Sequence, residues 1–417
     1  MREMKDSGIE WIGEIPADWE VSTIKREYVF QTGWTPDTTH EEYFVGENIW
    51  INISDMKSKV VYDSEKHISD EAVRLASMNI SPKGSLLYAF KLSVGAVSFC
   101  GIDMYTNEAI ATFLPGKNNL RFLYYTAPIF IIKNANENIY GAKLLNQKLI
   151  RNAKIVIPPL EVQKRIADCL DRKCSQIDAI IVRQQEVIEK LKAYKLSVIT
   201  EAVTKGLNPD VPMKDSGVEW IGEIPEHWEV MRFGRCAAIK SNLVAPDDYA
   251  DYPQISPDSI EKNSGRILEY KTVKESGVIS WNHLFFKGQI IYSKIRPMLN
   301  KVAIAPFDGL CSADMYPIET NNNTQFLVYM MLSDYFTSQV GLVTENRVKM
   351  PKINQNELGA IMVTIPPQIE QETISKYLLE KCSSVDAVID KKQGLIDKLD
   401  DYKKSLIYEV VTGKKEV

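Results

Sequence analysis

Residues Ile155–Gly206 read IVIPPLEVQKRIADCLDRKCSQIDAIIVRQQEVIEKLKAYKLSVITEAVTKG. A second copy, Val363–Lys414, reads VTIPPQIEQETISKYLLEKCSSVDAVIDKKQGLIDKLDDYKKSLIYEVVTGK. In each copy a Pro-Pro pair precedes a long run without proline, and proline suits the first turn of a helix, where its missing N–H costs nothing. Each copy is therefore predicted to be one helix. At about 1.5 Å per residue, some 45 residues form a rod roughly 65 Å long.

Both predicted helices carry an apolar seam whose spacing alternates between four and three residues, which is typical of a coiled coil. Gln184 and Lys392 occupy equivalent seam positions, and Lys195 or Lys403 follows near the end of each seam. Polar seam residues cost stability and fix register, so we expect a specific helix partner. The seam consists of Leu170, Cys174, Ile177, Ile181, Ile188 and Leu191 in the first copy and Leu378, Cys382, Val385, Ile389, Ile396 and Leu399 in the second.

The alternative is that both helices are buried in an ordinary all-α core. The charged positions leave only a narrow apolar stripe on each helix, which favours the coiled coil.

A shorter repeat shows that the whole chain is duplicated. Met4–Val21, MKDSGIEWIGEIPADWEV, returns at Met213–Val230 as MKDSGVEWIGEIPEHWEV. Between each short repeat and its helix lie Ser22–Lys154 (block 1) and Met231–Met362 (block 2), which barely resemble each other in sequence. Both blocks mix β-rich runs and turns with one helical stretch, so the predicted fold class is α+β, with two globular domains joined by two long helices. The predicted helical stretches are Leu120–Asn134 and Thr324–Val340, and the predicted segments are 1–154, 155–208, 209–362 and 363–417.

The composition is that of a globular protein, with 417 residues, 45% hydrophobic and 25% charged residues. No apolar run approaches the roughly 18 residues of a membrane span. Six cysteines without regular spacing predict reduced thiols and a cytoplasmic location. The net charge is −5, yet the stretches 72–102, 138–160 and 276–307 contain lysine and arginine without any acid. Such local basic faces suit a DNA surface.

Several short motifs follow one another in a fixed order along the chain. They are Trp11-Ile-Gly-Glu-Ile-Pro and its repeat, Gln31-Thr-Gly-Trp-Thr-Pro, Ile49-Trp-Ile-Asn-Ile-Ser-Asp55, Ser85-Leu-Leu-Tyr-Ala-Phe, Gly288-Gln-Ile-Ile-Tyr-Ser-Lys-Ile-Arg-Pro-Met-Leu-Asn-Lys301 and the helices that begin with Ile-Pro-Pro. Over its whole length the chain resembles the DNA specificity subunits of type I restriction–modification enzymes.

This resemblance implies a pseudo-two-fold tandem repeat with two antiparallel helices that form a coiled coil. Segments 1–154 and 209–362 would be target recognition domains, each reading one half of an asymmetric bipartite DNA site, and 155–208 and 363–417 would be spacer helices. It also implies two methyltransferase (modification) subunits docked on the helices, and restriction–translocation subunits added to them. S-adenosylmethionine, ATP and Mg²⁺ would belong to these partners, with no cofactor in this chain.

Polar and basic residues in predicted loops are the candidates for DNA contact. Arginine and lysine suit guanine O6 and N7, asparagine and glutamine suit adenine, and hydroxyls or other lysines hold phosphates. Lys294-Ile-Arg296 is the favoured group, because two cations flank one apolar residue, whereas Trp34 and Asp55 are expected to be a packing aromatic and a cap. The candidates are Gln31, Thr32, Asn52, Ser54, Lys57, Tyr88, Lys91, Asn107, Tyr140 and Lys143 in block 1 and Ser256, Ser293, Lys294, Arg296, Asn300, Lys301, Ser312, Arg347 and Lys349 in block 2.

The sequence lacks the common enzyme signatures. It has no glycine-rich nucleotide loop with Lys-Ser/Thr and no Cys/His spacing of a zinc site, so we predict no catalytic residue and no metal. Asp258, Glu269 and Lys271 reproduce the loose Pro-Asp…Glu-x-Lys arrangement of metal-dependent nucleases, which is one alternative function. A coiled-coil adaptor that binds only proteins is the other. A duplicated frame with divergent loops rich in Lys, Asn and Ser favours a non-catalytic DNA-binding subunit over both.

Overall fold

The computed structural model describes residues 2–137, 141, 143–345, 347 and 350–417. The chain divides into two compact units, unit 1 (Met1–Val182 and Ile396–Val417) and unit 2 (Arg183–Leu395). Each unit contains one block, one short repeat and part of both long helices. The four predicted segments follow the sequence repeat instead of these contacts, and their boundaries stay a prediction.

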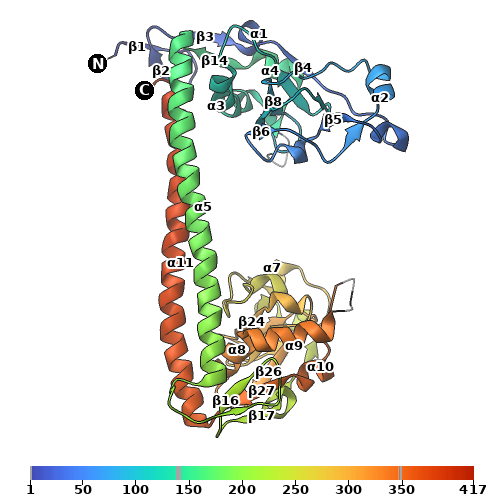
Figure 1. Ribbon diagram of the computed structural model, residues 1–417, viewed down its shortest axis with the longest axis vertical. Helices are drawn as coiled ribbons and strands as arrows, with labels where there is room; N and C mark the ends of the chain where they lie inside the picture. Colours follow the sequence, from blue (N-terminus) through green and yellow to red (C-terminus); the bar gives the residue numbers. More distant parts are fainter. Residues whose placement is uncertain (1, 138–140, 142, 346, 348–349) are drawn as a thin grey trace. The chain divides into compact units, whose positions relative to one another are not determined.

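The two long helices are α5, Leu160–Lys205, and α11, Gln368–Val411, with 46 and 44 residues. Figure 1 shows α5 in green and α11 in red. In unit 2, Lys392 Nζ lies 2.8 Å from Gln184 Oε1, and Lys195 Nζ lies 2.8 Å from Asp386 Oδ2. The residue numbers rise along one helix as they fall along the other, so the pairing is antiparallel. This confirms the prediction of two long antiparallel helices.

The predicted seam residues of both helices are buried or partly buried. Tyr194, Leu395 and Tyr402, which flank the seam, are exposed. The apolar stripe is therefore as narrow as a coiled coil requires, and these helices do not lie within an all-α core.

The elements of unit 1 before α5 make an α+β block and its frame. Besides short 3₁₀ turns, they are β1 Met4–Asp6, β2 Glu14–Pro16, β3 Glu20–Thr23, α1 Ile24–Glu27, β4 Phe30–Thr32, β5 Asn48–Ile51, β6 Val60–Val61, β7 His67–Ile68, α2 Asp70–Leu75, β8 Leu86–Ala89, β9 Val97–Cys100, β10 Tyr105–Thr106, β11 Ile110–Phe113, α3 Leu120–Phe130, β12 Asn136–Glu137, β13 Lys143–Leu144, α4 Gln147–Asn152 and β14 Lys154–Ile157. The central sheet has the order β4-β11-β8-β9-β6, and a smaller sheet has the order β10-β5-β7.

The elements of unit 2 between the long helices repeat this plan. They are β15 Met213–Asp215, β16 Glu223–Pro225, β17 Glu229–Arg232, α6 Phe233–Cys236, β18 Ala237–Ile239, β19 Leu243–Val244, β20 Pro253–Ile255, β21 Lys271–Thr272, α7 Val273–Ser276, β22 Asn282–Phe285, β23 Ile290–Ser293, β24 Val302–Ile304, β25 Gly309–Cys311, β26 Met315–Thr320, α8 Thr324–Leu332, α9 Asp334–Thr344, α10 Gln355–Ala360 and β27 Met362–Ile365. The central sheet has the order β18-β26-β23-β24, and the second sheet has the order β19-β22-β25-β20-β21.

The two blocks thus share a common strand arrangement, although their sequences barely resemble each other. In both, a hairpin (β8–β9 or β23–β24) pairs antiparallel with the strand before the block's main helix, β11 or β26. The predicted helix Thr324–Val340 is in fact two helices, because Ser333 is extended and its hydroxyl donates to Met330 O. In block 1, α3 ends at Phe130 and a 3₁₀ turn, Ile132–Asn134, follows it.

The short repeats frame each block. Each forms a hairpin, β1–β2 or β15–β16, and the next strand, β3 or β17, pairs with the strand that leads into a long helix, β14 or β27. Trp19 and Trp228 of the repeats are buried beside Gly413 and Gly206, which follow the ends of α11 and α5. A Cβ on Gly413 would lie 2.4 Å from Pro16 Cδ, so glycine is needed there.

A buried glutamine ties block 1 to the start of α5. Gln163 Nε2 donates to Asn118 Oδ1 at 2.8 Å and to Pro158 O at 3.0 Å, and Gln163 Oε1 accepts from Asn119 N at 2.9 Å. Asn119 also caps α3. We call this arrangement the Gln–Asn clamp.

Unit 2 repeats the clamp bond for bond. Gln371 Nε2 donates to Asn322 Oδ1 at 3.0 Å and to Pro366 O at 2.9 Å, and Gln371 Oε1 accepts from Asn323 N at 2.9 Å. Asn323 caps α8. Two blocks of unlike sequence are therefore held to their helices by the same device.

Candidate nucleic-acid interface

Two asparagines of block 1 lie together where parallel strands end. Strands β5 and β10 are parallel, with Ile51 opposite Thr106. Asn52 follows β5 and Asn107 follows β10, and Asn107 N donates to Ile51 O at 3.0 Å. Since parallel strands end at the same edge of a sheet, both side chains emerge there.

Both asparagines use their side-chain oxygen within the protein. Asn52 Oδ1 accepts hydrogen bonds from Ser54 N at 2.7 Å and Ser54 Oγ at 2.5 Å, and Asp55 Oδ2 accepts from Asn52 N at 2.9 Å, which confirms Asp55 as a cap. Asn107 Oδ1 accepts from Ala109 N at 3.1 Å. Within the part of the chain that the structure describes, neither Nδ2 has a protein partner. Each asparagine thus keeps a free N–H₂ donor.

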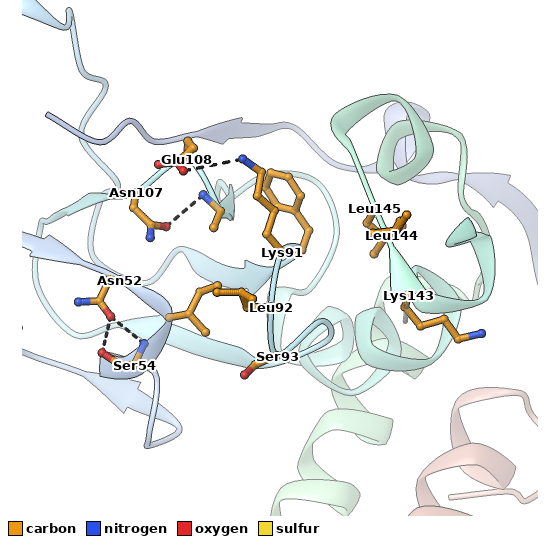
Figure 2. A pocket seen from close by; sticks show the side chains of 13 residues that line it. Asn52, Ser54, Lys91, Leu92, Ser93, Asn107, Glu108, Lys143, Leu144 and Leu145 are labelled. Atoms are coloured by element: carbon orange, nitrogen blue, oxygen red, sulfur yellow. Dashed lines mark hydrogen bonds and ion pairs between the residues drawn. The ribbon is translucent and has the colours of Figure 1, made fainter. Parts of the chain in front are cut away.

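The asparagines open onto a hollow of about 700 Å³, which we call the block 1 hollow. Figure 2 shows it between the ends of β5 and β10, the β8–β9 loop and the β13 strand. Five predicted candidates meet here, and the prediction missed the loop tip, Leu92 and Ser93, and the acidic Glu108. The lining residues are Asn52, Ile53, Ser54, Phe90, Lys91, Leu92, Ser93, Asn107, Glu108, Ala109, Lys143, Leu144 and Leu145.

The hollow carries charge of both signs. Lys91 Nζ lies 3.8 Å from Glu108 Oε1, and Thr35 Oγ1 donates to the other carboxylate oxygen. Partial burial raises the pKa of Glu108, but the hydrogen bonds from Thr35 and from its own backbone N–H, together with the positive charge of Lys91, outweigh it and lower that pKa below its usual value. Lys143 pairs with Glu137. The lysines are therefore partly neutralised, which leaves polar donors prominent on this surface.

Block 2 places two serines at the equivalent positions. Strands β20 and β25 are parallel, Ser256 follows β20 and Ser312 follows β25. Ser312 N donates to Ile255 O at 2.9 Å, as Asn107 N does in block 1. Ser256 caps a 3₁₀ turn, and Ser312 Oγ accepts from Asp314 N at 3.2 Å. The backbone site is the same in both blocks, and the side chains differ.

The remaining candidates of block 1 do not line the hollow. Gln31 Nε2 donates to Ile80 O at 2.7 Å, Thr32 Oγ1 accepts from Gln147 Nε2 at 2.9 Å, and Lys57 is exposed. The prediction of a loop position for Tyr88 is wrong, because it lies in β8 with 0% exposure. Tyr140 lies outside the described residues, and Trp34, expected to be a packing aromatic, is 41% exposed.

Two block 2 candidates have structural roles instead of the predicted loop exposure. Ser293 is buried in β23 and donates to Ile295 O at 3.1 Å. Asn300 is buried, and its Nδ2 donates to Met331 O and Thr337 Oγ1. These side chains cannot reach a partner without unfolding their surroundings.

The basic candidates of block 2 are more varied. Lys294 Nζ lies 5.3 Å from the centre of the Tyr316 ring, and Arg296 is exposed in the β23–β24 loop with a left-handed φ of 44°. Lys301 Nζ donates to Pro257 O at 2.7 Å. Arg347 pairs with Glu357. The remaining candidate, Lys349, lies outside the described residues.

The nuclease arrangement does not assemble. Asp258 lies in a 3₁₀ turn with its side chain 99% exposed and paired with Lys301, not on a strand beside the others. Glu269 precedes β21 and Lys271 is its first residue. Among the described residues no group of three or more His, Cys, Asp or Glu side chains could hold a metal ion.

All six cysteines are buried and free of disulfides. Burial raises the pKa of Cys236 and Cys382 to about 11 in each case, so these thiols stay protonated at neutral pH. In the described ranges, no helix combines the length and apolar character needed to span a bilayer.

Comparison with known proteins identifies the family of the chain. The family model for the type I restriction modification DNA specificity domain matches residues 16–190 and 225–400. The chain belongs to this family. It is 32% identical over 300 residues to the type I restriction enzyme EcoDI specificity subunit of Escherichia coli, covering 68% of this chain and 67% of that one. The MjaIX specificity subunit of Methanocaldococcus jannaschii is 26% identical over 86% of this chain and 85% of its own.

A solved structure has the same fold. It is described as the structural basis of complex assembly and conformational transition of the type I R-M system, and it matches with a TM-score of 0.70 at 13% identity. The match covers 96% of this chain and 99% of that chain. Membership of the family and the tandem pair of domains make this chain a DNA sequence-specificity subunit of a type I restriction–modification system.

Proposed function

We propose that block 1 and block 2 each read one half of an asymmetric bipartite DNA site. The observation that carries this is the shared site on unlike residues: parallel strands end in Asn52 and Asn107 in one block and in Ser256 and Ser312 in the other. The two blocks have the same backbone arrangement but carry different hydrogen-bonding side chains. Each block can therefore recognise a different short base sequence, because base edges are distinguished by their donor and acceptor patterns.

In this proposal the long helices dock two modification subunits, to which restriction subunits add. The chain itself is non-catalytic and works in the cytoplasm, and S-adenosylmethionine, ATP and Mg²⁺ serve the partners. Two features support this division of labour. The exposed Tyr194, Leu395 and Tyr402 flank the coiled-coil seam and offer apolar surface to a partner. The nuclease residues Asp258 and Glu269 do not come together on adjacent strands.

The test is methylome sequencing of cells that express this chain with its cognate modification subunit. We expect methylation at a split motif. Replacing Ser22–Lys154 by the corresponding block of a relative should change one half of the motif and leave the other half unchanged. Replacing Met231–Met362 should do the reverse.

Methylation that neither replacement alters would overturn the proposal and favour a protein-only adaptor. Gln163 and Gln371 lie in the helices and are retained in both replacements. The new block is chosen to carry asparagines at the places of their clamp partners, so that it is held in the same way; these partners are Asn118, Asn119, Asn322 and Asn323.

A further inference from the structure

Asn52 offers a donor and no acceptor. Its Oδ1 accepts two hydrogen bonds, from Ser54 N and Ser54 Oγ, which is as many as a carbonyl oxygen ordinarily takes. Because a backbone N–H fixes the oxygen, the amide cannot turn over, and Nδ2 is directed away from the cap. Its two hydrogens have no protein partner in the ranges that the structure describes.

The neighbouring groups add further donors. Asn107 holds its Oδ1 on Ala109 N and keeps its Nδ2 free, and Lys91 stands on the β8–β9 loop across the same hollow. The one acidic side chain of the lining, Glu108, already accepts a hydrogen bond from Thr35 and forms an ion pair with Lys91. A base that enters beside the two asparagines therefore meets the Nδ2 donors of Asn52 and Asn107, with the Lys91 ammonium across the hollow.

This excludes the usual pairing of asparagine with adenine. That pairing needs the amide oxygen to accept from adenine N6 while the nitrogen donates to N7. A donor-only amide instead requires acceptors, and guanine presents two in the major groove, O6 and N7. Thymine O4 and adenine N7 each offer one acceptor there, so guanine, with two neighbouring acceptors, is the base that a donor-only surface favours. Cytosine offers only its N4 donor and is rejected.

We propose that Asn52 is a specificity-determining residue that reads a guanine in the first half of the bipartite site through its Nδ2 donor. The inference rests on the proposed function, because it assumes that block 1 reads one half-site. It goes beyond that function by naming the base and the atom that reads it.

The variants follow from the chain itself. Asn52→Ser installs the residue that block 2 uses at the equivalent Ser256, so the cap is retained and the amide donor is lost. We expect one position of the first half-motif to become degenerate, with discrimination there falling about tenfold. The second half-motif should be unchanged. Asn52→Asp keeps a capping oxygen and turns the donor into an acceptor, so the preference should move towards cytosine or adenine.

Asn146→Asp is the matched control. Asn146 caps α4 by accepting from Leu149 N at 2.9 Å, so the variant adds the same charge to another cap of block 1. If it alters the motif as Asn52→Asp does, charge alone is responsible and the inference fails. If Asn52→Ser methylates the original motif without degeneracy, Asn52 reads no base, although the two-block function would still stand.

A measurement on the unaltered protein removes any dependence on folding of the variants. The complex of the wild-type chain with its modification subunits is titrated with duplexes in which each guanine of the first half-site is replaced singly by 7-deazaguanine, which lacks the N7 acceptor, or by 2-aminopurine, which lacks the O6 acceptor. We expect one replacement to weaken binding about tenfold. Unchanged binding for every replacement, or a first half-site without guanine on either strand, overturns the inference.

Discussion

Equivalent ion pairs join the two long helices in both units, but at different depths. Lys195 and Asp386 pair in unit 2 with side chains 7% and 24% exposed, whereas their repeat counterparts Lys403 and Asp178 pair in unit 1 at 28% and 52%. The same chemistry therefore has different consequences. The charge of a nearly buried lysine is stabilised mainly by its carboxylate partner, whereas the charge of an exposed lysine is also stabilised by water.

The blocks also dock on the helices by different chemistry beyond the shared clamp. In unit 1, Asp171 of α5 accepts from Lys59, Arg121 and Tyr125 of block 1. The repeat position in unit 2 is Leu379, which is exposed. There an apolar cluster that includes residues of α8 and α11 holds the block. The α5 counterparts Ile166, Leu170 and Cys174 are buried as well, so unit 1 has the ionic contact of Asp171 in addition to buried apolar residues on the helix.

The largest expected effect separates the two ion pairs. Asp386→Ala leaves the Lys195 ammonium buried without a partner and should cost about 3–5 kcal/mol of the stability of unit 2. Asp178→Ala should cost no more than about 1 kcal/mol in unit 1. Hydrogen exchange of α5 and α11 amides measures both. Equal losses in the two units would contradict the difference in burial. The double variant Asp386→Ala with Lys195→Met should recover most of the loss.

A middle-sized effect should be common to both units. Gln163→Leu and Gln371→Leu each remove the partner of a buried proline carbonyl, a partly buried backbone N–H and a partly buried asparagine oxygen, at a cost of about 1–3 kcal/mol. Faster hydrogen exchange in the first turns of α3 and α8, respectively, would report it. Gln176→Leu, on an exposed position of α5, is the control and should change neither. An effect in only one unit would show that the clamps are not equivalent.

The smallest expected effect is a loss of stability around α3 at low pH. Burial raises the pKa of Asp171, but hydrogen bonds from Lys59, Tyr125 and Arg121 outweigh it and lower that pKa below the usual 3.8. A lowered native pKa means that this carboxylate stabilises the fold above its ordinary pKa, and that the contribution fades as pH falls through the native value. Exchange of α3 amides should accelerate below about pH 4.

The comparison with unit 2 sharpens this test. Leu379 has no charge to lose, so protection of α8 should hold over the same pH range. Asp171→Asn should make α3 exchange faster at neutral pH and remove its acid response. If the amides of α8 exchange faster at low pH to the same extent as those of α3, protonation of Asp171 is not the cause.

The sequence was sufficient where a pattern repeats along one element. The long helices of 46 and 44 residues follow from their spacing, and the duplicated frame follows from the two short repeats. The common core of the blocks was invisible, because strand order depends on contacts between segments far apart in the chain. The clamp did leave a signal: Pro-Pro-x-x-x-Gln stands in both copies, at Gln163 and Gln371, although the intervening residues differ.

The site was predicted only in part, for a related reason. Asn52, Lys91, Asn107 and Lys143 come from four separate segments, and chemistry alone suggested them. Chemistry could not show that Tyr88 and Asn300 are buried, since a tyrosine or asparagine near a loop suits either place. Nor could it show that the Asn52 oxygen is already used, because that depends on the turn formed after β5.

Gln184 and Lys392 show why the two copies must differ at a seam position where equivalent residues contact each other. They occupy the same place in the two copies, and Lys392 donates to Gln184 at 2.8 Å. Just after a duplication the two copies are identical, so at this position the same residue type lies on both helices and faces itself across the seam. Two lysines there would set ammonium against ammonium in a seam. This position can hold a lysine in one copy only if the other copy gives it up, so the departure from perfect repetition is itself part of what keeps the halves together.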